Sequence, residues 1–395
     1  MVTGAYFPEL SGGGLQARAV VRALGRDADF CVLTTSTNPL LPARTAEAGV
    51  SIERVHVDVR RAVSRLTAAL RLALAFTRFA SHIDVVNLHG FSRKAILLVA
   101  LSRVFRKRFI LTLQTGIQDE PESVRASGRF AYWAYRSADL YLSVSPGLSR
   151  AYLDAGLPGA RLRQVCNAVD IERFKPAGAE ERRALRAELK LPQELPLVLF
   201  VGVFSRDKRP HLLYDAWARM AAAGGLKAGL VFIGATLPIN QDIDPGLAQT
   251  IRERATADGL APQVFFVESS QAIEKYFGAV DVYVLPSIRE GLSIALLEAM
   301  SSGLPCVASR LPGSTDMLIE HGVNGLLVTP DDRDSLADAI DSLVRNRDMA
   351  ARLGSSARQT VVARYSIQGT AAAWLMAYQE LAGRRVATAA GPERS

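Results

Sequence analysis

Short apolar runs alternate with longer stretches of helical periodicity along the chain. This alternation predicts parallel strands joined by crossover helices. In the first half, the apolar runs end near Thr34, Val57, Leu88, Leu113 and Val144. A second series comprises residues 197–201, 229–233, 264–267, 282–285 and 306–308. We therefore expect an α/β protein with two Rossmann-like domains that face each other across a cleft.

A polar, charged segment that contains Lys175-Pro176 separates the two series. It divides the chain into a first domain at 1–168, an interdomain connection at 169–194 and a second domain at 195–365. A last helix is expected within 366–383. The polar residues 384–395 are predicted to be a disordered tail.

The net formal charge of +8 is concentrated in the first domain. Residues 1–168 hold 22 Lys and Arg against 12 Asp and Glu, whereas residues 169–395 hold 25 against 27. A basic first domain favours anionic lipid surfaces, nucleic acids or anionic small molecules as partners. No apolar run reaches the ~18 residues that a membrane-spanning helix needs, and the first residues lack a signal-peptide pattern.

The three cysteines, Cys31, Cys166 and Cys306, are scattered and form no Cys-x-x-Cys pair. This usage predicts neither a disulfide framework nor a metal cluster. It is typical of a reducing compartment, where single cysteines are small buried hydrophobes.

The most informative segment is residues 286–300, PSIREGLSIALLEAM, where a strand pattern gives way to a helical one. Glu290 and Gly291 are expected at the carboxyl end of a strand, where open α/β sheets bind ligands. The amides of Leu292, Ser293 and Ile294 would then begin the helix and bind an anion.

Glu298 lies about one helical turn beyond these amides, at ~1.5 Å rise per residue. With Glu290 at the mouth, it would give two carboxylates that flank an anion site. This arrangement suits a ligand with hydroxyls on both sides of a diphosphate, such as a nucleotide sugar.

A glycine-rich stretch, Gly12-Gly13-Gly14, precedes a helix that is expected to begin near Leu15. Its Gly-x-Gly-x-x-Ala spacing formally fits the dinucleotide fingerprint. That fingerprint also needs an acid at the end of the second strand, where this chain has Thr34-Thr35-Ser36. A nicotinamide site is therefore disfavoured.

Five segments resemble, in order, the motifs of the retaining GT-B glycosyltransferases of glycosyltransferase family 4. They are PELSGGG, VCNAVDIERFKP, FVGVFSRDKRP, PSIREGLSIALLEAMSSGLP and LPGSTDMLIEHGVNGLLVTPDD. The resemblance covers nearly the whole chain and implies a GT-B fold whose last helix crosses back onto the first domain. Family members place a full apolar strand before the glycine loop, so the sequence is expected either to begin a few residues short or to tolerate a very short strand.

The resemblance implies roles on the donor side. Glu298 would bind the ribose hydroxyls and Glu290 the sugar hydroxyls, while Lys208 and the amides of residues 292–294 would hold the diphosphate. Gly13, Gly14, Gly291 and Val267 are the other donor-binding candidates.

Other positions depart from the family pattern. Val203 stands where the family has Arg, so Arg206 is the candidate substitute as a second catalytic cation. His89 and Gln114 are the acceptor-side candidates, and Gln114 replaces the usual histidine. A glutamine can donate and accept hydrogen bonds but cannot act as a base. Ala168 replaces the glycine of the mid-chain motif.

The segment Asp242-Ile243-Asp244 matches the metal-binding Asp-x-Asp of another glycosyltransferase fold. It lies in a polar stretch, and no further acid or histidine is placed to complete an octahedral site, so a solvated loop is favoured. We expect no metal and no cofactor.

Basic residues interrupt an apolar helix that is expected from Val63 to Phe79; they are Arg60, Arg61, Arg65, Arg71 and Arg78. Arg103, Arg106, Lys107 and Arg108 form a second cluster. Two interpretations stay open: an interfacial helix on anionic lipid, or a solvated helix face.

Together these features predict a cytoplasmic, retaining, metal-independent hexosyltransferase, peripheral on the inner face of the membrane. It would use a nucleoside diphosphate sugar and a glycan or lipid-linked acceptor, and would not bind nucleic acid. The alternatives are a GT-B sugar phosphorylase or nucleotide-sugar epimerase, which differ in their need for an acceptor hydroxyl, and a non-catalytic nucleotide-sugar-binding subunit, which would bind without turnover.

Overall fold

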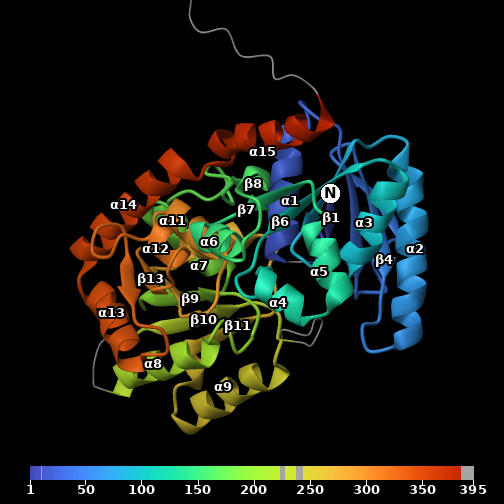
Figure 1. Ribbon diagram of the computed structural model, residues 1–395. Helices are drawn as coiled ribbons and strands as arrows, with labels where there is room; N and C mark the ends of the chain where they lie inside the picture. The colour runs from blue at the N-terminus through green and yellow to red at the C-terminus, as the bar shows by residue number, and fades with distance from the viewer. Residues whose placement is uncertain (10, 223–226, 237–242, 384–395) are drawn as a thin grey trace, which may run out of the picture.

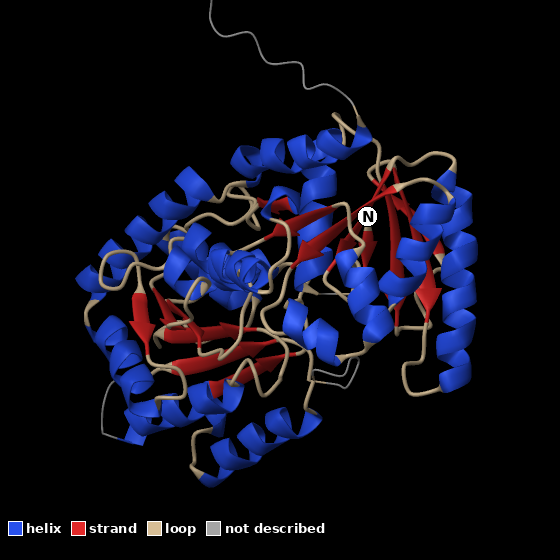
Figure 2. Cartoon of the chain, in the orientation of Figure 1, coloured by secondary structure: helices blue, strands red, loops and turns tan. Residues whose placement is uncertain are grey.

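The computed structural model describes residues 1–9, 11–222, 227–236 and 243–383, so the predicted tail at 384–395 lies outside the described residues. Two separate sheets, each flanked by helices, form the two predicted domains (Figures 1 and 2). The predicted α/β architecture is confirmed.

The first sheet has the strand order β3-β4-β2-β1-β5-β6-β7-β8 within the described residues. All neighbours are parallel except β3, which pairs antiparallel with β4 at the edge. Its strands are β1 (Val2–Thr3), β2 (Cys31–Ser36), β3 (Arg44–Glu47), β4 (Val50–His56), β5 (Val85–His89), β6 (Arg108–Leu113), β7 (Leu140–Ser143) and β8 (Leu162–Gln164). The two-residue β1 is central, because Val2 is in register with Leu33 on β2 and Leu88 on β5.

The second sheet is parallel throughout, in the order β11-β10-β9-β12-β13-β14. Its strands are β9 (Leu197–Val201), β10 (Gly229–Ile233), β11 (Val264–Val267), β12 (Val282–Leu285), β13 (Cys306–Ser309) and β14 (Leu326–Val328). Because β9 and β12 are neighbours at the point where the strand order reverses, the loops that follow them lie at the topological switch point, where such sheets bind ligands.

The helices cover both sheets. The first domain contains α1 (Gly12–Leu24), α2 (Ala62–Ala80), α3 (Lys94–Val104), α4 (Pro121–Ala126), α5 (Arg129–Arg136), α6 (Pro146–Asp154) and the 3₁₀ turn Gly159–Arg161. The rest of the chain contains α7 (Ala179–Glu188), α8 (Pro210–Ala222), α9 (Pro245–Ala257), the 3₁₀ turn Ala261–Gln263, α10 (Ile273–Ala279), α11 (Ile294–Ser301), α12 (Thr315–Leu318), α13 (Arg333–Arg345), α14 (Arg347–Arg364) and α15 (Ile367–Ala382).

The last helix returns to the first domain, as predicted (Figure 1). Trp374 on α15 is fully buried and stacks on the His89 ring, with ring centroids 5.9 Å apart. Tyr378 accepts a hydrogen bond from the Asn87 side chain at 2.9 Å. Burial of two large aromatic rings against β5 explains why α15 remains attached to this domain.

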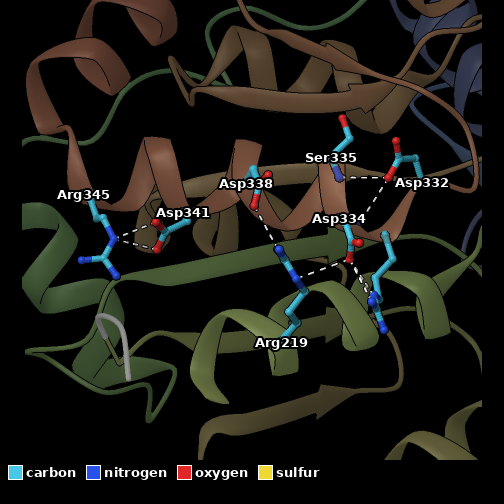
Figure 3. A network of polar contacts seen from close by, with 8 residues as sticks. Arg219, Asp332, Asp334, Ser335, Asp338, Asp341 and Arg345 are labelled. Carbon is cyan, nitrogen blue, oxygen red and sulfur yellow. Dashed lines mark hydrogen bonds and ion pairs between the residues drawn. The ribbon is translucent and has the colours of Figure 1, made fainter. Parts of the chain in front are cut away.

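Exposed ion pairs join α8 to α13 on the second domain (Figure 3). Arg219 on α8 lies 3.3 Å from Asp334 and 2.9 Å from Asp338 on α13. Asp332 caps α13 by accepting from the Ser335 amide at 3.0 Å. Exposed pairs of this kind contribute ~0–1 kcal/mol each, so these contacts orient α13 while apolar burial holds it in place.

Candidate active site

The loop between β12 and α11 is the segment in which the sequence predicts an anion site. Ser293 is the N-cap of α11, and its hydroxyl accepts from the Leu296 amide at 3.3 Å. Within the described residues, the amides of Leu292, Ser293 and Ile294 have no hydrogen-bond acceptor. Free amides at the positive end of a helix dipole are suited to a phosphate group.

Lys208 and Glu290 meet beside this loop. The Lys208 Nζ lies 2.6 Å from the Glu290 Oε1, and the Glu290 side chain is only 7% exposed. Lys208 follows β9 and Glu290 follows β12, so the pairing of these two strands brings the residues together. The ammonium offers positive charge beside the free amides, and the carboxylate retains acceptor capacity for hydroxyl groups.

Glu298 lies on α11 and is half-buried as a residue. No described residue hydrogen-bonds to this carboxyl. Burial raises the pKa of Glu298 to about 8; Arg173 opposes the rise and Glu274 adds to it. Arg173 is itself paired with Glu274 at 2.7 Å, and this pairing limits how far Arg173 lowers the pKa of Glu298. The ligand-free protein therefore carries a largely neutral, unpaired carboxyl in the predicted ribose position.

The glycine-rich start of α1 lies close to both acceptor-side candidates. Ser11 caps α1 by accepting from the Gly14 amide at 3.1 Å. A Cβ on Gly14 would lie 2.2 Å from the Ala5 carbonyl oxygen, so only glycine fits there. A Cβ on Gly13 would lie 3.7 Å from the His89 Cβ and 4.0 Å from the Gln114 Cγ. The structure thus brings Gly13, His89 and Gln114 together.

His89, one of the two acceptor-side candidates, is buried at the carboxyl end of β5. It is 5% exposed, and Trp374 stacks on its ring. The Gln114 amide nitrogen lies 3.3 Å from the His89 Nδ1. Burial lowers the pKa of His89 to about 3, so the imidazole is neutral. The ring supports Gln114, which is half-buried, and the acceptor-binding role of both residues stays a prediction.

The two domains touch at the site. A Cβ on Gly291 would lie 1.8 Å from the Gln114 carbonyl oxygen, and a Cβ on Gly116 would lie 3.1 Å from the Glu290 carbonyl oxygen. The Asn167 side chain donates to the Leu292 carbonyl at 2.9 Å. Gly291 is therefore required by a close approach of two backbones across the cleft.

Two residues important for this geometry had no assigned role in the sequence analysis. Asp119 is buried, and its carboxylate accepts from the amides of Phe91, Gln114 and Thr115 at 2.6–2.9 Å. Burial raises its pKa to about 6 despite these hydrogen bonds. No motif identified Asp119, whereas Asn167 lies in the VCNAVD segment and could have been noticed there.

Other predicted residues lie farther out. The Arg206 side chain is 82% exposed, and its Nε lies 3.3 Å from the Asp244 carboxylate. Its role as a substitute cation stays a prediction. Val267 ends β11, and its carbonyl accepts from the Gly234 amide at 3.0 Å, which places it at the carboxyl edge of the donor sheet.

Asp244 also caps α9 by accepting from the Gly246 amide at 3.1 Å. Asp242 lies outside the described residues. The part of the chain that the structure describes contains no group of three or more His, Cys, Asp or Glu residues that could hold a metal ion.

Two family models match the chain in succession. The model described as Glycosyltransferase Family 4 matches residues 10–173, and the model described as Glycosyl transferases group 1 matches residues 181–360. The sulfoquinovosyl transferase SQD2 of Arabidopsis thaliana is 30% identical over 231 residues, which are 57% of this chain and 41% of that protein. The D-inositol 3-phosphate glycosyltransferase of Mycobacterium marinum is 32% identical over 232 residues, which are 57% of this chain and 46% of that protein. The chain thus spans about half the length of these relatives.

Solved structures share the whole fold. The crystal structure of Anabaena HepE in complex with UDP and glucose superposes with a TM-score of 0.76 at 19% identity, covering 96% of this chain and 99% of that one. Sucrose-phosphate synthase from Thermosynechococcus elongatus gives a TM-score of 0.78 at 21% identity, covering 97% and 99%. The chain therefore belongs to glycosyltransferase family 4 and has the GT-B fold.

Proposed function

We propose that this protein transfers a hexose from a nucleoside diphosphate sugar to a hydroxyl acceptor, with retention of configuration and without a metal ion. The observation that carries the proposal is the Lys208–Glu290 pair beside the three free amides that begin α11. The Lys208 ammonium and the free amides suit a diphosphate, and the Glu290 carboxylate suits sugar hydroxyls. The complexes of HepE with UDP and with UDP-glucose support a donor of this class.

The residues present suit a front-face transfer. The bond between the anomeric carbon and the diphosphate oxygen breaks, the acceptor oxygen bonds to the same face of that carbon, and the acceptor proton passes to the leaving diphosphate. Lys208 and the amides of Leu292 to Ile294 would stabilise the charge that develops on the leaving group. No strong enzymatic base is needed, which is compatible with Gln114 and a neutral His89 on the acceptor side.

Acceptor dependence tests this proposal. Release of nucleoside diphosphate from UDP-, GDP- and ADP-hexoses would be measured with EDTA present, with and without a pool of hydroxyl acceptors. We expect release that needs an acceptor and survives EDTA. Formation of a sugar phosphate from added phosphate would instead identify a phosphorylase. Conversion of the donor's sugar into another sugar without an acceptor would identify an epimerase. Donor binding without any turnover would identify a binding subunit.

We further propose that the first domain docks on an anionic membrane through α2, which lies at its outer edge (Figure 1). One face of α2 buries Leu72 and Phe76 against the sheet. The other exposes four apolar side chains at helical spacing: Val63 at 76%, Leu66 at 66%, Leu70 at 61% and Leu74 at 58%. An exposed apolar stripe of this kind marks an interaction surface.

Exposed arginines flank this stripe. Arg65 and Arg71 form no ion pair within the described residues, and each basic residue near an anionic surface contributes ~1 kcal/mol. No helix in the described part of the chain is long and apolar enough to cross a bilayer. The apolar stripe and its arginines support the proposed arrangement, which is peripheral docking at the cytoplasmic face with a lipid-linked or glycan acceptor.

Sedimentation with liposomes tests the docking. Changing Leu66 and Leu70 together to Ser should release the protein from anionic liposomes, while Leu153→Ser, at an exposed leucine on α6, should not. Binding should weaken in 1 M salt, where the screening length falls to ~3 Å. Equal binding to neutral liposomes, or none by the unmodified protein, would contradict the docking.

A further inference from the structure

A cavity of about 720 Å³ lies at the outer edge of the first domain. Its walls are the segment that joins β2 to β3, the end of β4 and one side of α2, which runs along this edge (Figure 1). The volume is within the range of ~300–1,000 Å³ that is typical of ligand pockets. None of the residues assigned to donor or acceptor binding lines this cavity.

The lining of the cavity has an excess of positive charge. Four arginines, Arg44, Arg54, Arg71 and Arg78, share it with one carboxylate, Glu53. Glu53 forms an ion pair with Arg78 and lies 3.7 Å from the Arg44 Nε. Within the described residues, the Arg71 side chain has neither an ion pair nor a hydrogen bond. Four arginines against one glutamate leave an excess of three positive charges around the cavity.

One of these arginines is buried without a counter-charge. Arg54 is 7% exposed, and its guanidinium donates to the Thr45 hydroxyl and to the Phe7 carbonyl, both at 2.6 Å. Both acceptors are neutral, and no carboxylate of the described residues forms an ion pair with Arg54. Burial lowers the pKa of Arg54, because the surroundings disfavour its charge. An anion in the adjoining cavity would therefore stabilise this side chain, and a phosphate group matches the geometry of several guanidinium groups.

Apolar side chains border the charged lining on two sides. The loop from residue 39 to residue 43 reads Pro-Leu-Leu-Pro-Ala, and its Leu40 is 89% exposed. On the opposite side, Leu74 of α2 lines the cavity and also belongs to the exposed apolar stripe of that helix. A cationic centre between two exposed apolar rims fits an amphiphile with an anionic head, as basic pockets on membrane-bound proteins do.

We propose that this cavity binds the head group of one anionic phospholipid, with Leu40 and Leu74 on either side among its acyl chains. The proposal rests on the proposed docking of α2 on a membrane. It adds a site for a single lipid molecule and a second membrane contact, the loop at 39–43. This lipid is an anchor and not the acceptor, because β4 lies four strands from β6, the strand that leads to Gln114. At ~4.8 Å per strand, that separation is about 19 Å.

Calorimetry with a monomeric lipid tests the site on the full-length protein. The probe is dihexanoyl phosphatidylglycerol below its critical micelle concentration, so no charged surface is present. We expect saturable binding of one lipid, weakened about tenfold to hundredfold in Arg71→Gln because a charge-assisted contact is lost. Arg65→Gln is the matched control, since Arg65 is exposed on the same helix but does not line the cavity. No binding by the unmodified protein, or equal losses in the two variants, would overturn the proposal.

Two further ligands test the chemical class. Glycerophosphoglycerol carries the same head group without acyl chains, and dihexanoyl phosphatidylcholine carries the same chains with no net charge. Both should bind at least about tenfold more weakly than dihexanoyl phosphatidylglycerol. Equal affinity for the chain-free compound would assign the cavity to a soluble anion, and equal affinity for the phosphatidylcholine would show that the arginines do not select an anionic lipid. Either result would refute the lipid site.

Tryptophan fluorescence tests whether the loop enters the bilayer. Trp217 and Trp374 are fully buried and Trp133 is 48% exposed, so the unmodified protein gives the background signal. On anionic vesicles with brominated acyl chains, Leu40→Trp should add emission that the bromine quenches. Leu153→Trp, at an exposed leucine on α6, should add emission that is not quenched. Equal quenching at the two positions would contradict insertion of the loop.

The same measurements separate the lipid site from the docking itself. Sedimentation of the unmodified protein with anionic vesicles, without any binding of the monomeric lipid, would remove the site and leave the docking of α2 standing. Binding of the monomeric lipid without sedimentation would support the site and contradict the docking.

Discussion

The pH dependence of donor binding follows from the environment of Glu298. Its pKa of about 8 arises from burial, and no described residue hydrogen-bonds to the carboxyl. Ribose hydroxyls that donate to the group favour its charged form, so donor binding must release a proton. At pH 7 that ionisation costs about 1.4 kcal/mol, since the pKa lies one unit above the pH.

The affinity should therefore rise with pH. For one group with a pKa of about 8, the dissociation constant falls about tenfold from pH 6 to 7 and about fivefold from pH 7 to 8, after which it levels off. Calorimetry with a nucleotide sugar would measure this, because its diphosphate diester does not titrate in the range. The proton released should appear as a dependence of the binding enthalpy on the buffer.

Two variants separate Glu298 from its neighbours. Glu298→Gln should bind ~1.5–3 kcal/mol more weakly at pH 8 and lose the pH dependence, because a hydrogen bond to a charged group is lost. Glu274→Gln should move the inflection to lower pH, because it removes a nearby negative charge and frees Arg173. A pH-independent affinity between pH 6 and 8, or an unchanged profile in Glu298→Gln, would refute the reasoning.

Three further variants probe the contacts between the site loops. Lys208→Ala should lower kcat about 10²–10³-fold and weaken donor binding less, because the leaving diphosphate gains charge in the transition state. Equal losses in kcat, measured by kinetics, and in donor affinity, measured by calorimetry, would show that Lys208 only binds the ground-state donor. Gly291→Ala should force the domains apart at Gln114, which should lower kcat about 10²-fold and increase the radius of gyration measured by X-ray scattering. An unchanged radius of gyration and an unchanged kcat would contradict the close approach of the two backbones. Asn167→Ala should remove the hydrogen bond to the Leu292 carbonyl and weaken donor binding by ~0.5–1.5 kcal/mol, measured by calorimetry; unchanged affinity would show that the donor loop holds its shape without Asn167.

Much of the fold could be predicted because the strands of parallel sheets are continuous apolar runs. The strands at 197–201, 229–233 and 264–267 match β9, β10 and β11 residue for residue. The strands β3, β8 and β14 were missed because they are edge strands of three or four residues, and β3 and β8 have no buried side chain. Helix α7 lies in the segment expected to be a connection, and it packs on α10 of the second domain.

The relative positions of the candidate site residues could be predicted where one motif supplies several of them. Glu290, Gly291 and the amides before α11 belong to one strand-to-helix turn, so local spacing determines their relation. The pairing of Glu290 with Lys208 depends on the adjacency of β9 and β12, which the sequence does not state. The burial of His89 could not be predicted, because α15, the helix that stacks Trp374 on it, comes nearly 300 residues later in the chain. The three amides that Asp119 holds likewise belong to loops that meet only in the folded sheet.

The configuration of the product tests the central claim most directly. The protein would be incubated in EDTA with α-linked nucleoside diphosphate hexoses and the acceptor that supports nucleotide release, and the new glycosidic bond would be analysed by NMR. We expect an α-linked product from the unmodified protein, formed about 10²–10³-fold more slowly by a Lys208→Ala variant that remains folded by circular dichroism. A β-linked product, a strict need for Mn²⁺, or no transfer to any acceptor would contradict retaining, metal-independent transfer at the Lys208–Glu290 site.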